Sequence, residues 1–238
     1  SAGASQRENV TVLYGGATDR RYRWTGETWE RWNNPIGESG RLPGDFVRFN
    51  PGFAAPNLSE APLLFGGFRS GSVTSGSGAA TNTAFRIRPD GWTGLSTGPV
   101  ARLAHAMAGD GEQVIVFGGT EYSTTGEEGE REHFGALLDD TWTFDGANWN
   151  ALCAACDPKP SARSFSAMAP TGVDREVVLF GGGTGYRSPL GDTWIFDRDR
   201  GIDGEWRSLD SQSPAARADH ALAFDPWRAG VVLFGGAD

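Results

Sequence analysis

The chain repeats one short stretch, a strand-like apolar run that ends in two glycines, and its clearest copy is Val178-Leu179-Phe180-Gly181-Gly182. Five copies occur, and their first glycines lie at positions 15, 66, 118, 181 and 235, which are 51, 52, 63 and 54 residues apart. A period near fifty residues indicates one supersecondary unit copied along the chain. Residues that recur in every copy are expected to hold the unit together, whereas residues that differ between copies can carry function.

Each unit contains four segments that predict four consecutive β-strands with turns between them. In the clearest copy, residues 164–168 precede the apolar run, and Asp192-Thr193-Trp194-Ile195-Phe196 and a segment around Trp206 follow it. The first and last segments alternate apolar and polar residues, as half-buried strands do. First strands are expected around residues 45–50, 103–108, 164–168 and 220–224. Four-stranded antiparallel sheets bury both faces when they stack around an axis, so the sequence predicts an all-β propeller.

Several large or charged residues recur at fixed places in the units. They are Arg102, Arg163 and Arg217, His105 and His220, Trp142 and Trp194, and Trp149 and Trp206. Because they repeat, we expect the arginines to form an ion pair or carbonyl contact between units rather than to bind a ligand. Ser166 stands at the histidine position in one unit, which indicates hydrogen-bonded inner-strand residues rather than a metal or catalytic site. The tryptophans are large enough to fill the space between adjacent sheets.

Together, the paired glycines, the Asp/Asn-Thr-Trp segment, the trailing tryptophan and the Arg-x-x-His opening resemble the kelch repeat. The resemblance covers almost the whole chain, with several matched positions in each copy. It implies a kelch-type β-propeller of four-stranded antiparallel blades around a central channel. It also implies that the loops after the glycines and the loops between blades lie on one face, which usually binds the ligand in this family.

The units predict a single array over residues 1–238 of about four to five blades, incomplete at both termini. The partial and full blades are expected at 1–32, 41–95, 99–152, 160–209 and 214–238. Second strands outnumber first strands, so the chain begins and ends within a unit. Three interpretations stay open: a piece of a propeller with six or seven blades, a small ring that closes on itself, or open edges that pair with another chain or a second copy.

Composition excludes several classes of partner. The net charge is −9 and the pI is about 4.9, which argues against nucleic acid and against an anionic membrane surface. No apolar run approaches the roughly 20 residues that a membrane-spanning helix needs. Cys153 and Cys156 are the only cysteines, and their spacing and setting argue against a zinc or redox site. A loop-pinning disulfide and two free thiols in a reducing compartment stay open, and we favour the disulfide. We therefore expect a secreted, periplasmic or cell-surface protein, of bacterial origin.

Two insertions break the repeat. Residues 120–139 account for most of the longest step and are rich in Glu and Asp, with Asp140 directly after them. Their spacing matches no Ca²⁺ loop, so a solvated acidic loop is expected, and long insertions are often functional. Residues 69–80 are rich in Gly, Ser and Thr and predict a flexible segment. The first insertion is our preferred binding loop.

The sequence favours a binding or assembly module over an enzyme, because it holds no catalytic motif, no metal-ligand cluster and no cofactor signature. A protein or a glycan is expected to bind on the loop face. The candidate contact residues are Trp32, Tyr122, His133, Phe134, Tyr186 and Arg187. Two alternatives remain: an exported kelch-type enzyme that acts on carbohydrate, as an oxidase or sugar isomerase, and a purely structural part of a larger assembly.

Overall fold

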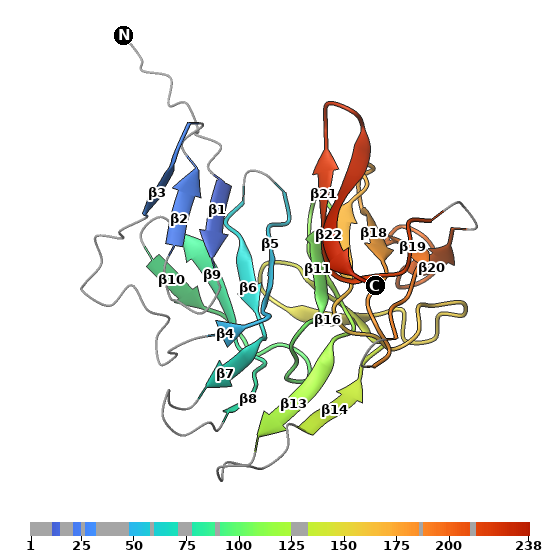
Figure 1. Ribbon diagram of the computed structural model, residues 1–238, viewed down its shortest axis with the longest axis horizontal. Helices are drawn as coiled ribbons and strands as arrows, with labels where there is room; N and C mark the ends of the chain where they lie inside the picture. The colour runs from blue at the N-terminus through green and yellow to red at the C-terminus, as the bar shows by residue number, and fades with distance from the viewer. Residues whose placement is uncertain are drawn as a thin grey trace.

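The computed structural model describes residues 11–14, 21–24, 27–31, 48–57, 60–70, 78–88, 91–124, 133–185, 188–209 and 213–238. In these parts all regular structure is β (Figure 1). The strands are β1 Thr11–Tyr14, β2 Arg21–Trp24, β3 Trp29–Arg31, β4 Arg48–Phe49, β5 Gly52–Ala54, β6 Leu63–Phe65, β7 Phe68–Ser70, β8 Gly78–Ala80, β9 Ala84–Arg88, β10 Gly91–Gly94, β11 Ala106–Gly109, β12 Val114–Phe117, β13 Thr120–Thr124, β14 His133–Leu137, β15 Thr141–Phe144, β16 Trp149–Leu152, β17 Ala167–Pro170, β18 Glu176–Phe180, β19 Thr193–Asp197, β20 Glu205–Ser208, β21 Ala218–Asp225 and β22 Gly230–Ala237.

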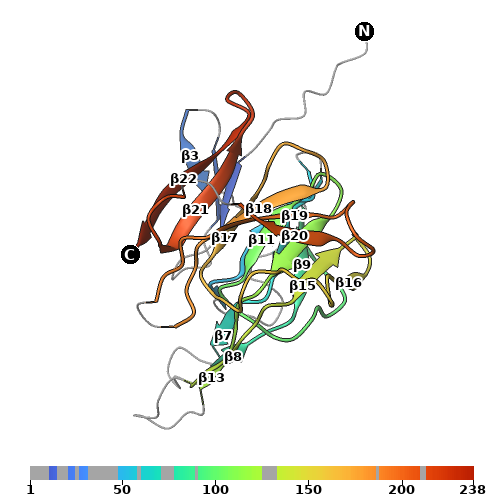
Figure 2. The same ribbon diagram turned by 90° about the vertical axis from the view of Figure 1, so that its right-hand side faces the viewer.

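Most of the strands form the predicted blades. Three sheets are four-stranded and antiparallel, in the orders β5-β6-β9-β10, β11-β12-β15-β16 and β17-β18-β19-β20. Each has its glycine-terminated apolar run as the second strand. The first and last sheets have three and two described strands, β1-β2-β3 and β21-β22. Strands β5, β11, β17 and β21 lie next to one another in that order, as the inner strands of successive blades do. Figure 2 shows β11, β17 and β21 of this row. The prediction of an all-β propeller with four-stranded antiparallel blades is confirmed.

Aromatic side chains fill the space between neighbouring blades. Phe117 of one blade meets Trp206 of the next at 5.1 Å between ring centroids, and Phe65 meets Trp149 at 4.6 Å. The indole N–H of the fully buried Trp206 donates to Thr141 Oγ1 across this interface, at 2.9 Å. Trp149 and Trp206 therefore pack against the preceding blade as well as against Phe144 and Phe196 of their own blades.

The glycine doublets connect one blade to the next. In three of the doublets, the second glycine donates its N–H to the carbonyl oxygen of the arginine that opens the next blade. The pairs are Gly67 to Arg102, Gly119 to Arg163 and Gly182 to Arg217, at 2.8, 2.8 and 2.9 Å. The first glycine lies so close to the same carbonyl that a Cβ atom on Gly181 would stand 2.5 Å from it. Its φ is also positive, at 60°. Only glycine meets both conditions without strain.

Strands from the two insertions, together with β4, form a separate sheet of five strands in the order β14-β13-β8-β7-β4. Strand β13 pairs with β8, so the acidic insertion and the Gly/Ser/Thr-rich insertion lie side by side. Two expectations are corrected here. The ends of the second insertion form strands β7 and β8 rather than a flexible segment, because β13 and β4 supply main-chain partners. The first strand expected at 45–50 is β5 at Gly52–Ala54, since Arg48–Phe49 joins this extra sheet.

Candidate binding face

In two of the full blades, β11-β12-β15-β16 and β17-β18-β19-β20, a buried arginine anchors the segment that precedes the first strand. The Arg102 guanidinium donates to both carboxylate oxygens of Asp140, at 2.6 and 2.7 Å, and to the carbonyl oxygen of Gly118, at 3.0 Å. The indole of Trp142 donates to the same carboxylate at 2.8 Å. In the next blade Arg163, Asp192 and Trp194 make the same contacts. We name this unit the Arg-Asp-Trp clasp.

The clasp controls the charge of its carboxylate. Burial alone would raise the pKa of Asp140, but the hydrogen-bonded Arg102 guanidinium outweighs this and keeps that pKa below its usual value. The pKa of Asp192 is lowered in the same way by Arg163 and Trp194 against its burial. We expected an ion pair or a carbonyl contact between blades, and the first alternative needs correction, because each ion pair lies within its own blade. The contact between blades is made by the arginine main-chain carbonyl.

A small pit of about 250 Å³ lies where the inner strands begin, and its lining includes one residue with positive φ from each of four units. These residues are Asn50, Ala104, Phe165 and Asp219, with φ between 49° and 58°. Ala104 donates its N–H to Asn50 O, Phe165 to Ala104 O and Asp219 to Phe165 O, at 3.0, 2.8 and 3.1 Å. A relay of main-chain hydrogen bonds therefore runs from blade to blade around the pit.

Polar side chains with unused hydrogen-bonding capacity face this pit. His105, Ser166 and His220 each follow one of the positive-φ residues, and all three side chains are buried. The His105 imidazole and the Ser166 hydroxyl have no hydrogen-bond partner within the described residues, whereas His220 interacts with the main chain of Phe180. Burial, with the nearby Arg102, lowers the pKa of His105 to about 3, so its ring is neutral at pH 7. The expected hydrogen bonds are therefore not found for His105 and Ser166 within the described residues. The rings of His105 and His220 instead contact Phe65 and Phe180 edge to face.

The five-stranded sheet begins at the same end of the molecule as the pit. Strand β4 leads directly into Asn50, and β13 follows the doublet Gly118-Gly119. Figures 1 and 2 both show this sheet projecting away from the end where β21 and β22 meet in their hairpin. We define the binding face as this sheet together with the pit. It is the one region of the described chain where the two insertions and the openings of the inner strands come together.

Comparisons with known proteins agree with this architecture. No protein-family model matches the chain. An F-box/kelch-repeat protein of Arabidopsis thaliana is 29% identical over 154 residues, which cover 61% of this chain and 30% of the relative. Adagio-like protein 3 of Oryza sativa is 33% identical over 43% of this chain and 16% of the relative. The solved structure of YjhT superposes with a TM-score of 0.70 over 96% of this chain and 69% of the other, at 15% identity.

The chain is a kelch-repeat β-propeller. This matches the resemblance found in the repeated residues. The chain spans 30% or less of the length of the two curated relatives named above.

Of the six contact residues predicted from the sequence, three lie in strands of the five-stranded sheet and three lie outside the described residues. Tyr122 lies in β13, where its half-buried ring contacts Phe68 edge to face at 5.2 Å. His133 and Phe134 lie in β14, and Phe134 is the cross-strand partner of Tyr122. Trp32, Tyr186 and Arg187 lie outside the described residues. Asp140, counted with the acidic insertion, instead belongs to the Arg-Asp-Trp clasp.

The remaining predicted groups lie away from the binding face. Cys153 and Cys156 form a disulfide with 4.9 Å between their Cα atoms, next to the inter-blade core. Within the described residues, no three His, Cys, Asp or Glu side chains gather as a metal ion would require. The described part of the propeller also contains no helix that could span a membrane.

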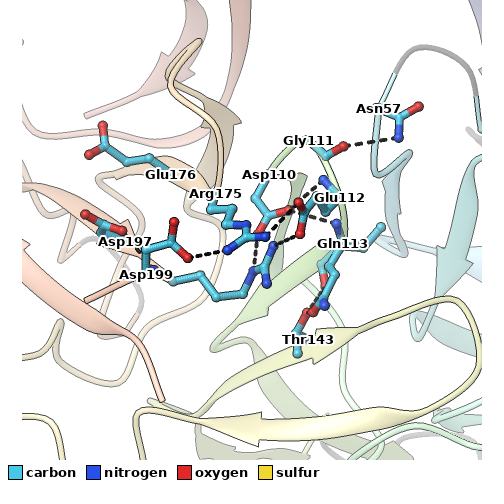
Figure 3. A network of polar contacts seen from close by, with 12 residues as sticks. Asn57, Asp110, Gly111, Glu112, Gln113, Thr143, Arg175, Glu176, Asp197 and Asp199 are labelled. Atoms are coloured by element: carbon cyan, nitrogen blue, oxygen red, sulfur yellow. Dashed lines mark hydrogen bonds and ion pairs between the residues drawn. The ribbon is translucent and has the colours of Figure 1, made fainter. Parts of the chain in front are cut away.

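At the opposite end of the inner strands, a polar network that the sequence did not suggest ties two blades together (Figure 3). The buried Asp110 accepts from Arg198 at 2.6 Å, and Glu112 accepts from Arg175 and Arg198, each at 2.9 Å. These two arginines lower the pKa of Glu112 to about 2. The partners are 63 to 88 residues apart in sequence and carry no shared motif, so no sequence signal could have paired them.

This far end also contains an apolar cavity of about 640 Å³. Its lining includes Phe53, Met107, Met168, Leu222 and Phe224, which come from four successive inner strands. The kelch propeller therefore has a small polar pit at one end of its inner strands and a larger apolar cavity at the other.

Proposed function

We propose that the protein is a binding module that docks another protein on the binding face. One observation carries this proposal: the two segments that break the repeat pair with each other, through β8 and β13, to build a sheet that no blade requires. Long insertions that acquire their own structure in a compact fold are often functional. The relatives support a modular role, because the kelch-containing match covers only 30% of the Arabidopsis protein.

The sheet offers a physical mode of recognition. Strand β14, His133–Leu137, is an edge strand that pairs with β13 on one side. An edge strand presents main-chain N–H and C=O groups that an extended peptide can pair with, and side-chain pockets then supply selectivity. Tyr122, half-buried beside Phe68, provides an aromatic anchor next to that edge. The net charge of −9 favours a basic partner surface.

A graft tests the proposal. Residues 120–139 would be replaced by residues 183–191, the connection at the same place in the next blade, which preserves both the glycine doublet and the aspartate of the clasp. Crosslinked partners would be captured from an extract of the source organism and quantified by mass spectrometry for the wild type, the graft and Tyr122→Ala. The control is Ile202→Ala, because Ile202 is fully exposed on the β19–β20 connection.

We expect the graft to abolish binding of the partners that the wild type captures. Tyr122→Ala should weaken binding of the same partners by about tenfold, as for loss of an aromatic anchor. The Ile202→Ala protein should retain all of them. A graft that folds, as judged by its thermal unfolding, and still retains every partner would contradict the proposal.

A glycan is the second candidate partner, favoured by the pit. The neutral imidazole of His105 and the hydroxyl of Ser166, which have no hydrogen-bond partner among the described residues, suit a ligand rich in hydroxyl groups. A glycan array with wild type and His105→Phe would test this, because the phenylalanine keeps the ring but removes both nitrogens. Following any bound sugar over time by NMR would distinguish simple binding from the carbohydrate-converting alternative.

We also propose that the protein works in an oxidising compartment, as the Cys153–Cys156 disulfide favours. Protein isolated from its source under thiol-trapping conditions should label at neither cysteine before reduction and at both after it. Labelling of both cysteines without reductant would place the protein in a reducing compartment and contradict this proposal.

A further inference from the structure

The Cys153–Cys156 disulfide closes a tight turn that contacts the neighbouring blade. Cys153 directly follows β16, and its side chain is buried in the core that also contains Trp206. Its main-chain N–H donates to Asp203 O of the next blade at 3.1 Å. Cys156 is only half-buried, with its sulfur 3.4 Å from Gly204 O. Both cysteines therefore contact the next blade, but only Cys153 is fully enclosed.

The segment after the disulfide contacts the end of the acidic insertion. Lys159, three residues beyond Cys156, forms an ion pair with Asp139 at 3.0 Å. Asp139 lies two residues after the end of β14, the edge strand of the binding face. Further along the same segment, the N–H of Arg163 donates to Leu138 O at 3.1 Å. A short stretch of chain therefore joins the disulfide to that edge strand.

The main chain of the turn depends on its surroundings. Cys153 has a φ of 57°, in the left-handed region that costs a residue with a Cβ free energy, and such a conformation persists only where neighbouring groups fix it. Here the disulfide, the core and the hydrogen bond to Asp203 O do so. Reduction removes the disulfide, and two thiols cannot stay at bonding distance. Because Cys153 is enclosed by the core, the turn has to open on the side of Cys156 and the residues that follow it.

We propose that this disulfide is a redox-sensitive switch of the binding face. In the oxidised protein, which is the resting form in an oxidising compartment, the closed turn places Lys159 against Asp139 and so fixes the end of β14. A dithiol reductant is oxidised to a disulfide, and Cys153 and Cys156 each gain one electron and one proton to become thiols. The turn then opens, Lys159 moves away from Asp139, and the end of β14 separates from its neighbours more often.

The switch is a form of regulation of the binding face, so its biological role rests on the proposed function. Its physical basis does not, because the disulfide, the Lys159–Asp139 ion pair and β14 all belong to the isolated chain. Reduction is expected to weaken the docking of a partner strand, since an edge strand that separates from its sheet offers no fixed row of main-chain groups.

Hydrogen exchange followed by mass spectrometry tests the switch on the full chain without a partner. Exchange of the main-chain amides of residues 134–138 would be measured in the oxidised protein and after reduction with dithiothreitol. The proteins compared are wild type, Lys159→Ala and Arg228→Ala. Arg228→Ala is the matched control, because it also removes an ion pair near the surface, with Asp225, but in the hairpin of β21 and β22.

We expect reduction to speed exchange of these amides about threefold in wild type, as for loss of one partly exposed ion pair. Lys159→Ala should show the faster exchange when oxidised, and reduction should then add little. Arg228→Ala should match wild type in both states. Unchanged exchange in the reduced wild type, as when the Cys156 thiol stays at Gly204 O and the turn keeps its place, would overturn the proposal.

Two other outcomes would also overturn it. An equal effect of reduction in wild type and in Lys159→Ala would show that Lys159 carries none of the effect. Faster exchange in every blade would show that the disulfide stabilises the whole array rather than the binding face. Because no partner takes part, these results are separate from the proposed function, which the graft of residues 120–139 tests.

Discussion

The β17–β20 blade and the β21–β22 pair start from nearly the same pattern and reach different states. Both have an opening arginine, a polar inner residue and an apolar run that ends in a glycine doublet. In the first, Arg163 and Phe180 are buried, whereas Phe234 of the second is largely exposed. The repeated residues therefore set the geometry of a half-blade by themselves, but their burial requires the third strand and the next blade. Stability in such an array is a property of neighbours rather than of single units.

The largest expected effect separates the two phenylalanines. Phe180→Ala should destabilise the chain by about 4 kcal/mol, because it leaves a cavity in a packed interface. Phe234→Ala should change the free energy of unfolding by less than about 0.5 kcal/mol, since an exposed side chain loses little burial. Urea denaturation of the two variants measures both values. Equal losses would mean that β22 is covered in solution.

The arginines give the next largest difference. Arg163→Ala should cost about 3 kcal/mol, because it leaves the Asp192 carboxylate without its cation and opens space in the blade. Arg217→Ala should cost about 1 kcal/mol or less, since it removes only bonds to carbonyl groups near the surface. The same denaturation experiment applies, with Arg228→Ala as the surface reference. A loss at Arg217 as large as at Arg163 would remove the distinction between the two regions.

The first glycines of the doublets sharpen the comparison further. Gly181→Ala should cost about 2 kcal/mol, because the methyl group meets Arg217 O at 2.5 Å and φ is 60°. Gly235→Ala has the same backbone strain, with φ of 73°, but no steric conflict, so about 1 kcal/mol is expected. The thermal unfolding midpoints of the two variants would show whether Gly181→Ala is the more destabilising substitution. A larger loss at Gly235 would contradict it.

Unlike the effects of the substitutions at pH 7, the next effect is a dependence of stability on pH, which comes from the buried His105. The pKa of His105 is lowered to about 3 in the folded protein, whereas an unfolded histidine titrates near 6.5. Stability from the neutral ring is therefore complete above pH 6.5 and is lost as pH falls toward 3, by up to about 1.4 kcal/mol per unit. The lowered pKa values of Asp140 and Asp192 act only below about pH 4.

His105→Ser isolates this histidine, because Ser166 occupies the same place in the next blade. The variant should show a shallower fall in unfolding free energy between pH 7 and pH 5 than wild type, whatever its stability at pH 7. Parallel pH profiles would show that the pKa of His105 is the same in the folded and the unfolded protein.

Most of the blade architecture could be predicted from the sequence, because residues with the same structural role recur at the same positions in several units. The doublets at Gly118 and Gly181 mark close approaches of neighbouring main chains, and the tryptophans mark the space between sheets. The five-stranded sheet could not be predicted, because neither insertion alternates apolar and polar residues. The pairing of Arg198 with Asp110 across 88 residues likewise leaves no local trace. The binding face is therefore the part of the molecule that depends most on tertiary structure.

The relay of main-chain hydrogen bonds around the pit has a direction. Ala104, Phe165 and Asp219 each donate backward along the chain, and Asn50, Ala104 and Phe165 each accept from the following unit. Every internal unit thus offers the same acceptor to its successor and the same donor to its predecessor. Duplicating one unit within the array would leave both new junctions chemically complete, whereas reversing one would break them. Units can therefore be added by tandem duplication without a change in the main-chain hydrogen bonds around the pit. The number of units can vary, but each unit must run in the same direction.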